Sequence, residues 1–366
     1  HKIPLTFRAA GTSLSGQSIT DGILVDLSRH WKNIQASDEG NFVKVQSSAI
    51  GAHVNHVLKK HARKIGPDPA SISAAMMGGI LSNNSSGMCC GVTHNSYHTL
   101  ESIHFVLPNG HEYDTSIKAD YDRFEVDDKD IFEGILRLRG TVLTNENLLE
   151  KIRRKYKIKN TVGYCINAFA DYEHPLDILA HLLIGGEGTL AFIASAILKT
   201  IPDKPFKITG LLFFENPVVA AENIPALKST NAEALELMDR SALRSVEHLD
   251  YCPEMVKSLP ANATAILCEY QASSADELEV IFQEAQTVLY TLPLISTVAF
   301  TKDSLIQSQY WKIRKGLYPS VAAVRDKGTT AMLEDVAVPL ENLGTAVTDL
   351  HLLFQQYGYT NAIIFG

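Results

Sequence analysis

A run of glycines and hydroxyl side chains near the start of the chain has the residue types that bind an anion. It comprises Arg8, Ala9, Ala10, Gly11, Thr12, Ser13, Leu14, Ser15, Gly16 and Gln17. It lies between two apolar stretches, 3–7 and 23–27, which we expect to be strands. Successive backbone N–H groups in such a loop form a concave nest for phosphate, and glycines permit a close approach that a Cβ would block. Many ordinary turns are also rich in Gly and Ser, so the run alone leaves that interpretation open.

A second segment, residues 66–91, crowds small residues and amides together and carries almost no charge. Its sequence is GPDPASISAAMMGGILSNNSSGMCCG. Apolar periodicity is lost after Ile80, so the pattern does not predict a regular amphipathic helix. This composition is typical of a chain whose backbone a bulky ligand approaches closely. A third glycine-containing segment, GGEGTLAFI, occupies residues 185–193.

In this order, the three segments resemble the FAD-binding fold of the vanillyl-alcohol-oxidase (PCMH) type, and within it the D-lactate, glycolate and D-2-hydroxyglutarate dehydrogenases. NNSSGMCCG, KNTVGYCINAF and the closing IIFG are similar to the large bacterial members that carry an iron–sulfur extension. The resemblance implies that the first loop wraps the FAD pyrophosphate, the second segment lines the dinucleotide, and the third passes the adenine and the flavin. Beyond the first loop, it assigns to FAD the residues Pro67, Gly78, Gly79, Asn83, Asn84, Ser86, Gly87, Gly188, Phe192 and Ile193.

The resemblance implies an α+β chain of two domains. We expect an FAD-binding domain at 1–203, without its N-terminal part, and an α+β substrate or cap domain at 204–366, without its C-terminal part. In the first we expect strands at 3–7, 23–27, 42–46, 102–107, 112–115 and 188–200, and helices at 50–64, 116–160 and 177–184. In the second we expect strands at 207–214, 263–271, 296–301, 329–338 and 361–365, and helices at 232–249, 275–290, 303–325 and 340–357. Such alternation fits a sheet with helices on one face.

Arg314 and Tyr318 are candidate substrate-binding residues. They are four positions apart, so they share a helix face, and Pro319 is expected to end or kink that helix. A guanidinium presents a fork that matches a carboxylate. The resemblance places the substrate-carboxylate arginine at Arg314 and a polar substrate neighbour at Tyr318. An arginine on a solvated helix surface is the alternative.

One departure from the family pattern bears on the substrate. The short-substrate members have a lysine in the strand after this helix, and Leu333 stands at that position. This favours a monocarboxylate such as D-lactate over a substrate with a second carboxylate, such as 2-hydroxyglutarate. Glu334 and Asp335 follow, either as acid–base groups or as charges that flank a helix.

No residue pattern predicts a metal site. His53, His56 and His61 are three and five positions apart, so they do not share one helix face. The five cysteines show no C-x2-C spacing, which argues against a disulfide framework or an iron–sulfur site in this segment. An iron–sulfur cluster is therefore expected only in a further C-terminal domain.

For two cysteines, a pair of acids and a basic run, the sequence leaves two interpretations open. Cys89 and Cys90 are either attachment points for flavin or small buried hydrophobes, and we expect non-covalent FAD because the first loop lacks the histidine of tethered relatives. The acids of 236–239 belong to a family motif or to a solvated helix. One interpretation of the basic run 151–159 is a docking site for an anionic partner or a membrane surface. The other is a solvated helical face.

Composition excludes several classes of protein. The 366 residues are 45% hydrophobic, enough for two cores, and the net charge of −8 argues against a nucleic-acid partner. No run approaches the roughly 18 apolar residues of a transmembrane segment, and no signal peptide opens the chain. Free cysteines fit a reducing compartment. We therefore expect a cytoplasmic protein, or one peripheral at the inner membrane.

The resemblance implies FAD-dependent oxidation of a D-2-hydroxy acid, foremost D-lactate, to the 2-oxo acid by hydride transfer to flavin. The electron acceptor would be a quinone, an iron–sulfur domain or a carrier protein. The chain starts just before the first loop and ends within an apparent strand, so we expect a βαβ piece upstream and, downstream, a His- and Asn-containing metal motif and a Glu-His pair that supply the base. The alternatives are an alcohol or sugar oxidase of the same fold, and a flavin-binding subunit without turnover of its own.

Overall fold

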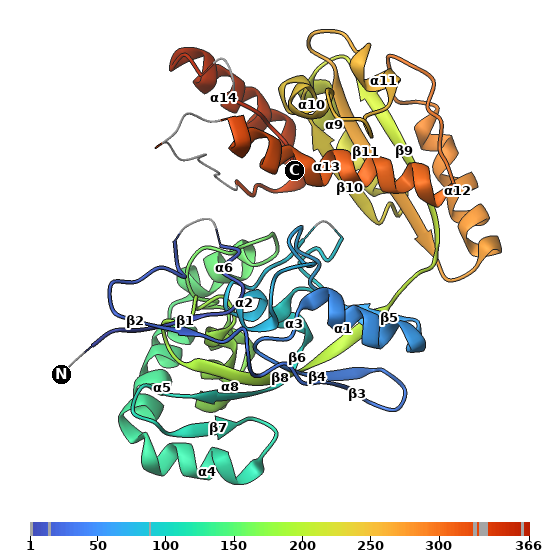
Figure 1. The fold of residues 1–366 in the computed structure, drawn as a ribbon. Helices are drawn as coiled ribbons and strands as arrows, with labels where there is room; N and C mark the ends of the chain where they lie inside the picture. The colour runs from blue at the N-terminus through green and yellow to red at the C-terminus, as the bar shows by residue number, and fades with distance from the viewer. Residues whose placement is uncertain (1–2, 14–15, 88, 325–327, 329–335, 360–361) are drawn as a thin grey trace. The chain divides into compact units, whose positions relative to one another are not determined.

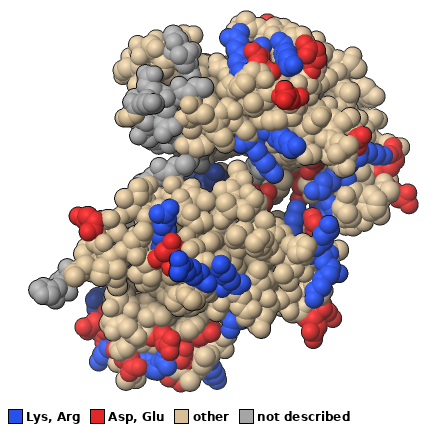
Figure 2. All heavy atoms as spheres, viewed as in Figure 1, with Lys and Arg blue, Asp and Glu red and all other residues tan. Residues whose placement is uncertain are grey.

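The computed structural model describes residues 3–13, 16–87, 89–324, 328, 336–359 and 362–366, and it divides into two compact units, 1–203 and 204–366 (Figure 1). Within the described residues, no helix is both long and apolar enough to cross a membrane. On the face drawn in Figure 2, Lys and Arg side chains form separate small groups among acidic and uncharged residues.

The first unit is built around one antiparallel sheet with the strand order β3-β4-β8-β6-β7, to which β5 is added by pairing with β8. A separate pair, β1 and β2, runs parallel. The strands are β1 (Leu5–Arg8), β2 (Ile23–Asp26), β3 (Ile34–Ala36), β4 (Phe42–Gln46), β5 (Arg63–Ile65), β6 (Leu100–Val106), β7 (Glu112–Asp114) and β8 (Phe192–Pro202). Because β1 and β2 are parallel, they cannot be joined by a tight hairpin turn.

Helices α5, α7 and α8 pack against one another, while α2 and α3 contact β8. The helices of this unit are α1 (Gly51–Leu58), a 3₁₀ turn (Lys59–His61), α2 (Met77–Ser82), α3 (Ser96–Thr99), α4 (Lys118–Asp127), α5 (Lys129–Thr144), α6 (Glu146–Lys155), α7 (Ala168–Asp171) and α8 (Pro175–Leu183). Every residue of α8 except Asp177 is buried, and Pro175 begins the helix where a missing N–H costs nothing.

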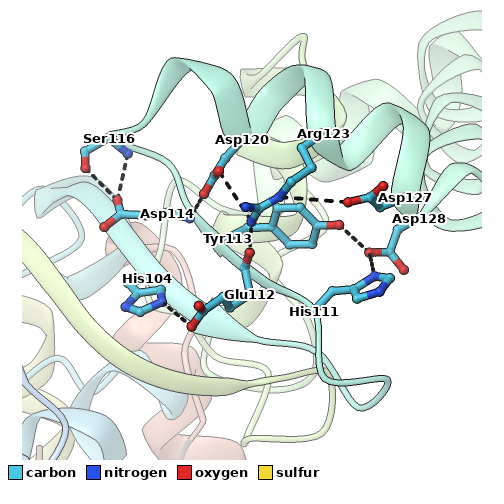
Figure 3. Close-up of polar contacts among 10 residues, drawn as sticks. All are labelled: His104, His111, Glu112, Tyr113, Asp114, Ser116, Asp120, Arg123, Asp127 and Asp128. Carbon is cyan, nitrogen blue, oxygen red and sulfur yellow. Dashed lines mark hydrogen bonds and ion pairs between the residues drawn. The ribbon is translucent and has the colours of Figure 1, made fainter.

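A polar network ties α4 to the β6–β7 hairpin (Figure 3). The Tyr113 hydroxyl donates to Asp128, which His111 also contacts at 2.9 Å. These contacts hold the pKa of Asp128 below its ordinary value although burial acts to raise it. Every partner in the network comes from the hairpin or the adjoining helix, so we assign it a structural role.

The second unit contains the antiparallel sheet β10-β11-β9 with helices on both faces (Figure 1). Its elements are β9 (Phe206–Phe214), α9 (Pro217–Lys228), β10 (Ala234–Met238), α10 (Arg240–Val246), α11 (Glu254–Lys257), β11 (Thr264–Ala272), α12 (Ala275–Leu289), α13 (Ser304–Val324), a 3₁₀ turn (Leu340–Asn342) and α14 (Leu343–Gln356). One core lies among the sheet, α9, α12 and α14, and a second among the sheet, α10 and α13. The expectation that helices cover only one face of this sheet was wrong. All nine residues of β11 are buried because helices cover both faces of the sheet.

Several other expectations were also wrong. Residues 232–249 are not one helix: β10 pairs with β11, and α10 begins after Asp239, whose side chain accepts a hydrogen bond from Ala242 N. Residues 296–301 and 362–365 make only isolated bridges, Thr209 with Thr301 and Met238 with Phe365. Pro319 does not end α13, which continues to Val324. Residues 336–338 are not in a strand, and 329–335, with Leu333, Glu334 and Asp335, lie outside the described residues.

Candidate functional site

Both glycines of the first loop have a positive φ angle, as one residue of an anion nest does. Gly11 has φ +67° and Gly16 has φ +82°, the left-handed region that glycine adopts without strain. The Arg8 side chain covers Gly11, since a Cβ there would lie 2.8 Å from Arg8 Nε. A Cβ on Gly16 would meet no described atom within 4 Å, so this position is open to a ligand.

The other residues of the loop lie around these glycines. Ala9 and Ala10 are half-buried, and Thr12 is exposed. Ser13 Oγ donates to Gln17 Oε1, and both side chains are exposed. Leu14 and Ser15 lie outside the described residues.

In the second segment, the two adjacent glycines have different surroundings. Gly78 N donates to Ser47 O at 2.8 Å, and a Cβ on Gly78 would lie 2.9 Å from Ser47 Cβ. Glycine is therefore needed at position 78 for the contact with Ser47. Gly79 is exposed at the start of α2, where a Cβ would meet no described atom within 4 Å. Of the pair, Gly79 is the position that a ligand can approach.

Beyond α2, the same segment folds back onto Pro67 and Asp68. Asp68 N donates to Ser86 O at 2.9 Å, and Asp68 forms a parallel bridge with Gly87. A Cβ on Gly87, which has φ +133°, would lie 2.2 Å from Asp68 O. Pro67 is buried, and Cys89 N donates to Asp68 Oδ2 at 3.1 Å. Burial raises the pKa of Asp68 to about 6, although these N–H donors act to lower it.

The third segment is joined to the second by a set of hydrogen bonds. Asn83 Nδ2 donates to Glu187 Oε1 at 2.7 Å, and Glu187 N donates to Ser82 O at 2.8 Å. Gly185 N donates to Leu81 O at 3.1 Å. Glu187 has φ +52°, a strained backbone conformation for a non-glycine residue that these two bonds hold in place.

Aromatic contacts join the strand that precedes the first loop to the third segment. Phe192 stacks on Phe7 with ring centroids 4.5 Å apart and meets Trp31 edge-on at 5.6 Å. Ser47 Oγ donates to Ile193 O, so Ser47 contacts the second and third segments at once. Gly188, at φ +72°, has no described atom within 4 Å of a Cβ position. The structure therefore joins the second and third segments directly and brings the strand that precedes the first loop to the third segment. The role of all three segments toward FAD stays a prediction.

Ser47, Trp31 and Glu187 were missed by the sequence analysis. Glu187 lies inside the third segment, so the motif itself offered a signal. Trp31 and Ser47 lie in stretches without a recognisable motif, and only the fold places them beside the motifs.

The thiol of Cys90 is buried, and burial raises its pKa to about 12, which keeps it protonated and weakly nucleophilic.

In the second unit, Arg314 on α13 forms an ion pair with Glu236 on β10 through its Nε. The guanidinium also lies over the Phe365 ring, 4.7 Å from the centroid. Tyr318 is half-buried one turn further along the helix. The acids of 236–239 therefore lie on a strand and at a helix cap, and the solvated-helix interpretation of them was wrong.

A buried carboxylate holds the preceding turn of α13. Glu269 on β11 is 2% exposed. Its Oε2 accepts hydrogen bonds from Trp311 Nε1 at 2.6 Å and from Thr209 Oγ1 at 2.8 Å, and its Oε1 accepts one from Gln271 Nε2 at 2.6 Å. Trp311 and Arg314 lie on adjacent turns, so two acidic residues of the sheet fix the face of α13 that carries Arg314.

No metal centre is found among the residues the structure describes, where no group of three His, Cys, Asp or Glu side chains is arranged for one. His53 and His56 are exposed on α1, and His61 is half-buried in the 3₁₀ turn that follows. In the basic run, the cationic side chains from Lys151 to Lys159 are exposed on α6 and the loop after it.

Comparison with known proteins finds one family match in each unit of the chain. Residues 1–116 match the FAD binding domain family, and residues 204–366 match the family of FAD linked oxidases, C-terminal domain. The chain is 26% identical over 98% of its length to D-2-hydroxyglutarate dehydrogenase of Pseudomonas putida, 24% over 96% to glycolate oxidase subunit GlcD of Bacillus subtilis, and 23% over 95% to D-lactate dehydrogenase of Anaerostipes hadrus.

These relatives are longer than the chain. The match spans 36% of the Pseudomonas putida protein and 63% of each of the other two. Among solved structures, an alkyldihydroxyacetonephosphate synthase aligns over 87% of this chain and 51% of its own, with a TM-score of 0.55 at 13% identity. That likeness concerns the fold alone.

Proposed function

Because this chain belongs to the FAD-linked oxidases, we propose that it oxidises a D-2-hydroxy acid, with D-lactate as the substrate, to the 2-oxo acid. Bound FAD would supply the hydride acceptor. In this proposal the first unit is the FAD-binding domain and the second is the substrate domain. The relatives named above act on hydroxy acids by their names, which supports the substrate class.

The residues of the first unit fit FAD. Gly11 and Gly16 present left-handed backbone in a loop of exposed hydroxyls, as a pyrophosphate requires. Gly16, Gly79 and Gly188 each leave open the space that a Cβ would occupy. The hydrogen bond from Asn83 to Glu187 and the contacts of Ser47 fix the second and third segments relative to each other. These features support the proposal that the first unit binds FAD.

The observation that carries the proposed substrate is Arg314. Its side chain is only 14% exposed, and Glu236 engages its Nε. A guanidinium has two further nitrogens, and in a fixed orientation they present a fork for the substrate carboxylate. The hydroxyl proton would leave to a base, for which the described residues supply no assigned candidate. Electrons would pass on to a quinone, an iron–sulfur domain or a carrier protein, in the cytoplasm or at the inner membrane.

The choice of D-lactate depends on Leu333, which stands where short-substrate relatives carry a lysine. An apolar residue there gives a second carboxylate no cationic partner. We therefore expect a higher kcat/KM for D-lactate than for D-2-hydroxyglutarate. The reverse order would overturn the choice of substrate while leaving the hydroxy-acid class intact.

Replacing Arg314 tests the proposal directly. Losing one partner of a shielded charge-assisted pair is worth about 2–5 kcal/mol, so Arg314→Met should lower kcat/KM for D-lactate at least about tenfold. Arg314→Lys should recover little, because an ammonium lacks the fork. FAD content should not change, because the helix is in the other unit. Parent-like turnover by Arg314→Met would place the substrate site elsewhere, and failure of D-lactate to bleach the flavin anaerobically would favour a subunit without turnover.

A further inference from the structure

A cleft in the second unit lies at the start of β9, between the first turns of α12 and α13. Both helices contact β9, and the three elements lie side by side in Figure 1. The cleft has a volume of about 190 Å³, and no Asp or Glu lines it. Arg314 lies about two turns of α13 beyond Gln307, which lines the cleft, so the cleft is separate from the proposed substrate anchor.

Strand β9 directs neighbouring side chains to the two sides of the cleft. Lys207 is opposite Gln271 in the pairing with β11, and opposite residues of an antiparallel pair share a face of the sheet. Gln271 is on the α13 face, because it bonds to Glu269, the carboxylate that holds α13. Phe206 is opposite Ala272, which lies in the core with α12. Lys207 therefore points to the α13 side of the cleft, and Phe206 to the α12 side.

Lys207 carries the uncompensated charge of the cleft. It is half-buried, and it forms no ion pair with an acidic side chain among the described residues. The neighbouring lysines are paired: Lys302 Nζ, also in the lining, is 2.9 Å from Glu279 Oε2, and Lys204 Nζ is 2.8 Å from Glu233 Oε2. The lining therefore offers one ammonium group to an anion, with the charge of the other already neutralised.

Gln307 holds the wall of the cleft in place. It is 9% exposed, and its Nε2 donates to Lys207 O at 2.9 Å and to Thr301 O at 3.0 Å. Both partners are carbonyl oxygens, so the amide cannot be flipped and both of its N–H groups are occupied. Ser304, exposed at the first position of α13, adds a hydroxyl and a backbone N–H without a partner inside the helix. The polar side of the cleft is therefore formed before a ligand binds.

The rest of the lining is apolar and sets the size of a ligand. It comprises Pro205, Phe206, Ala275 and Leu278. Phe206 is 42% exposed, so its ring is open to contact. A cavity of about 150 Å³ holds one benzene ring. At about 190 Å³, the cleft has room for one such ring with a carboxylate group, and it is too small to enclose a nucleotide.

We propose that this cleft binds a small aromatic monocarboxylate. Lys207 pairs with the carboxylate, and the Phe206 ring contacts the ring of the ligand. A monoanion matches the single uncompensated charge, because Glu279 already neutralises Lys302. The inference does not depend on the proposed reaction. Its alternative is a small inorganic-like anion held by Lys207 alone, with the apolar lining unused.

Calorimetric titration of the FAD-loaded protein with benzoate tests the site. We expect saturable binding with a Kd below about 2 mM, stronger than a lone exposed ion pair provides. Benzamide keeps the ring without the charge, and acetate keeps the charge without the ring. Each should bind at least about tenfold more weakly than benzoate. A benzoate Kd above this limit, or equal affinity for acetate or for benzamide, overturns the inference.

Substitutions at two neighbouring lysines locate the bound benzoate. Lys207→Met removes the charge and keeps an apolar stem, so the Kd should rise at least about tenfold. Lys204→Met is the matched control, because Lys204 is paired with Glu233 and does not line the cleft, and the Kd should change less than about twofold. If Lys207→Met does not fold, Phe206→Ala is the second variant, which should weaken benzoate at least about fivefold and leave acetate unchanged. Parent-like binding of benzoate by Lys207→Met or by Phe206→Ala overturns the inference.

Arg314→Met separates the cleft from the proposed substrate anchor, which also suits a carboxylate. Benzoate should still bind to this variant at one site, with a Kd below about 2 mM. If benzoate binding is lost in Arg314→Met and kept in Lys207→Met, the ligand occupies the substrate anchor. That result overturns the inference and leaves the proposed function standing.

Discussion

Arg314 on α13 and Glu236 on β10 form an ion pair in which the side chains are only 14% and 5% exposed. In so buried a pair, desolvation offsets most of the attraction, so the pair adds little net stability. Removing one partner is costly, however, because the other charge is left uncompensated. The pair does fix orientation: Glu236 holds Nε, while the Phe365 ring lies against the guanidinium plane at 4.7 Å. We infer that Glu236 is a positioning residue for the proposed carboxylate anchor.

The first prediction is a double-mutant cycle. Glu236→Gln keeps the shape but loses the charge that orients Arg314, so KM for D-lactate should rise about tenfold. In an Arg314→Met background the same change should alter KM less than about twofold, because there is no guanidinium left to orient. Equal effects of Glu236→Gln in both backgrounds would show that Glu236 acts on folding alone. A normal KM in Arg314→Met would instead refute the anchor itself.

Glu269 provides the matched control for that cycle. It is a buried acid on the neighbouring strand, and it also bonds to α13, through Trp311. Glu269→Gln should lower the free energy of unfolding by about 1–3 kcal/mol, since it replaces a strong acceptor of three hydrogen bonds. KM should change less than about threefold, because Trp311 and not Arg314 loses its partner. If Glu269→Gln raised KM as much as Glu236→Gln does, KM would depend on the position of the whole helix α13 and not on the orientation of Arg314.

The sequence predicted those elements whose local pattern agrees with their tertiary surroundings. Residues 207–214 and 263–271 are apolar and rich in strand formers, and they match β9 and β11 within one residue at each end. Ala234–Met238 is a strand made of good helix formers, and pairing with β11 overrides their propensity. A single-sequence pattern cannot anticipate this, because the partner strand lies some thirty residues away.

The same distinction applies to the site. The sequence motifs named the glycines of the first loop and Gly188 as candidate site residues. Such positions can be found from sequence because a left-handed backbone conformation favours glycine. Glu236 was named as part of a motif but not as the partner of Arg314, because the pair joins positions 78 residues apart. The burial of Asn167 arises only in the folded chain. Asparagine in a loop gives no sign of being buried.

Substitution of Gly16 tests the first loop. Gly16→Val places a β-branched residue at φ +82°, where FAD phosphate is expected, and should give a flavin-poor protein. Gly110→Val is the matched control, because Gly110 has φ +91° and equally open surroundings, in a turn outside the three segments. Both variants carry similar strain, but only Gly16→Val should lose flavin, measured as absorbance per polypeptide. Stoichiometric flavin in Gly16→Val would remove the loop from the binding site.

FAD is expected to bind without a covalent link. The first loop contains no histidine, and the Cys90 thiol, with a pKa of about 12, is a poor nucleophile at neutral pH. Acid precipitation should therefore release yellow flavin into the supernatant. Colour kept in the pellet would contradict this, and its loss in Cys89→Ser or Cys90→Ser would identify the attachment point.

Asp68 should make stability depend on pH. Burial raises its pKa to about 6 from 3.8, so the folded protein holds this proton between those values while the unfolded chain has released it. The contribution of Asp68 to the free energy of unfolding is therefore present at low pH and is lost as pH rises from about 4 to 6.

The substitution Asp68→Asn tests this, because asparagine keeps an acceptor for Cys89 N but cannot ionise. The gain in unfolding free energy from this substitution should be roughly 2 kcal/mol larger at pH 7.5 than at pH 4.5. Denaturant titrations of both proteins at the two pH values measure it, and a pH-independent difference between them would mean that Asp68 ionises at its ordinary pKa.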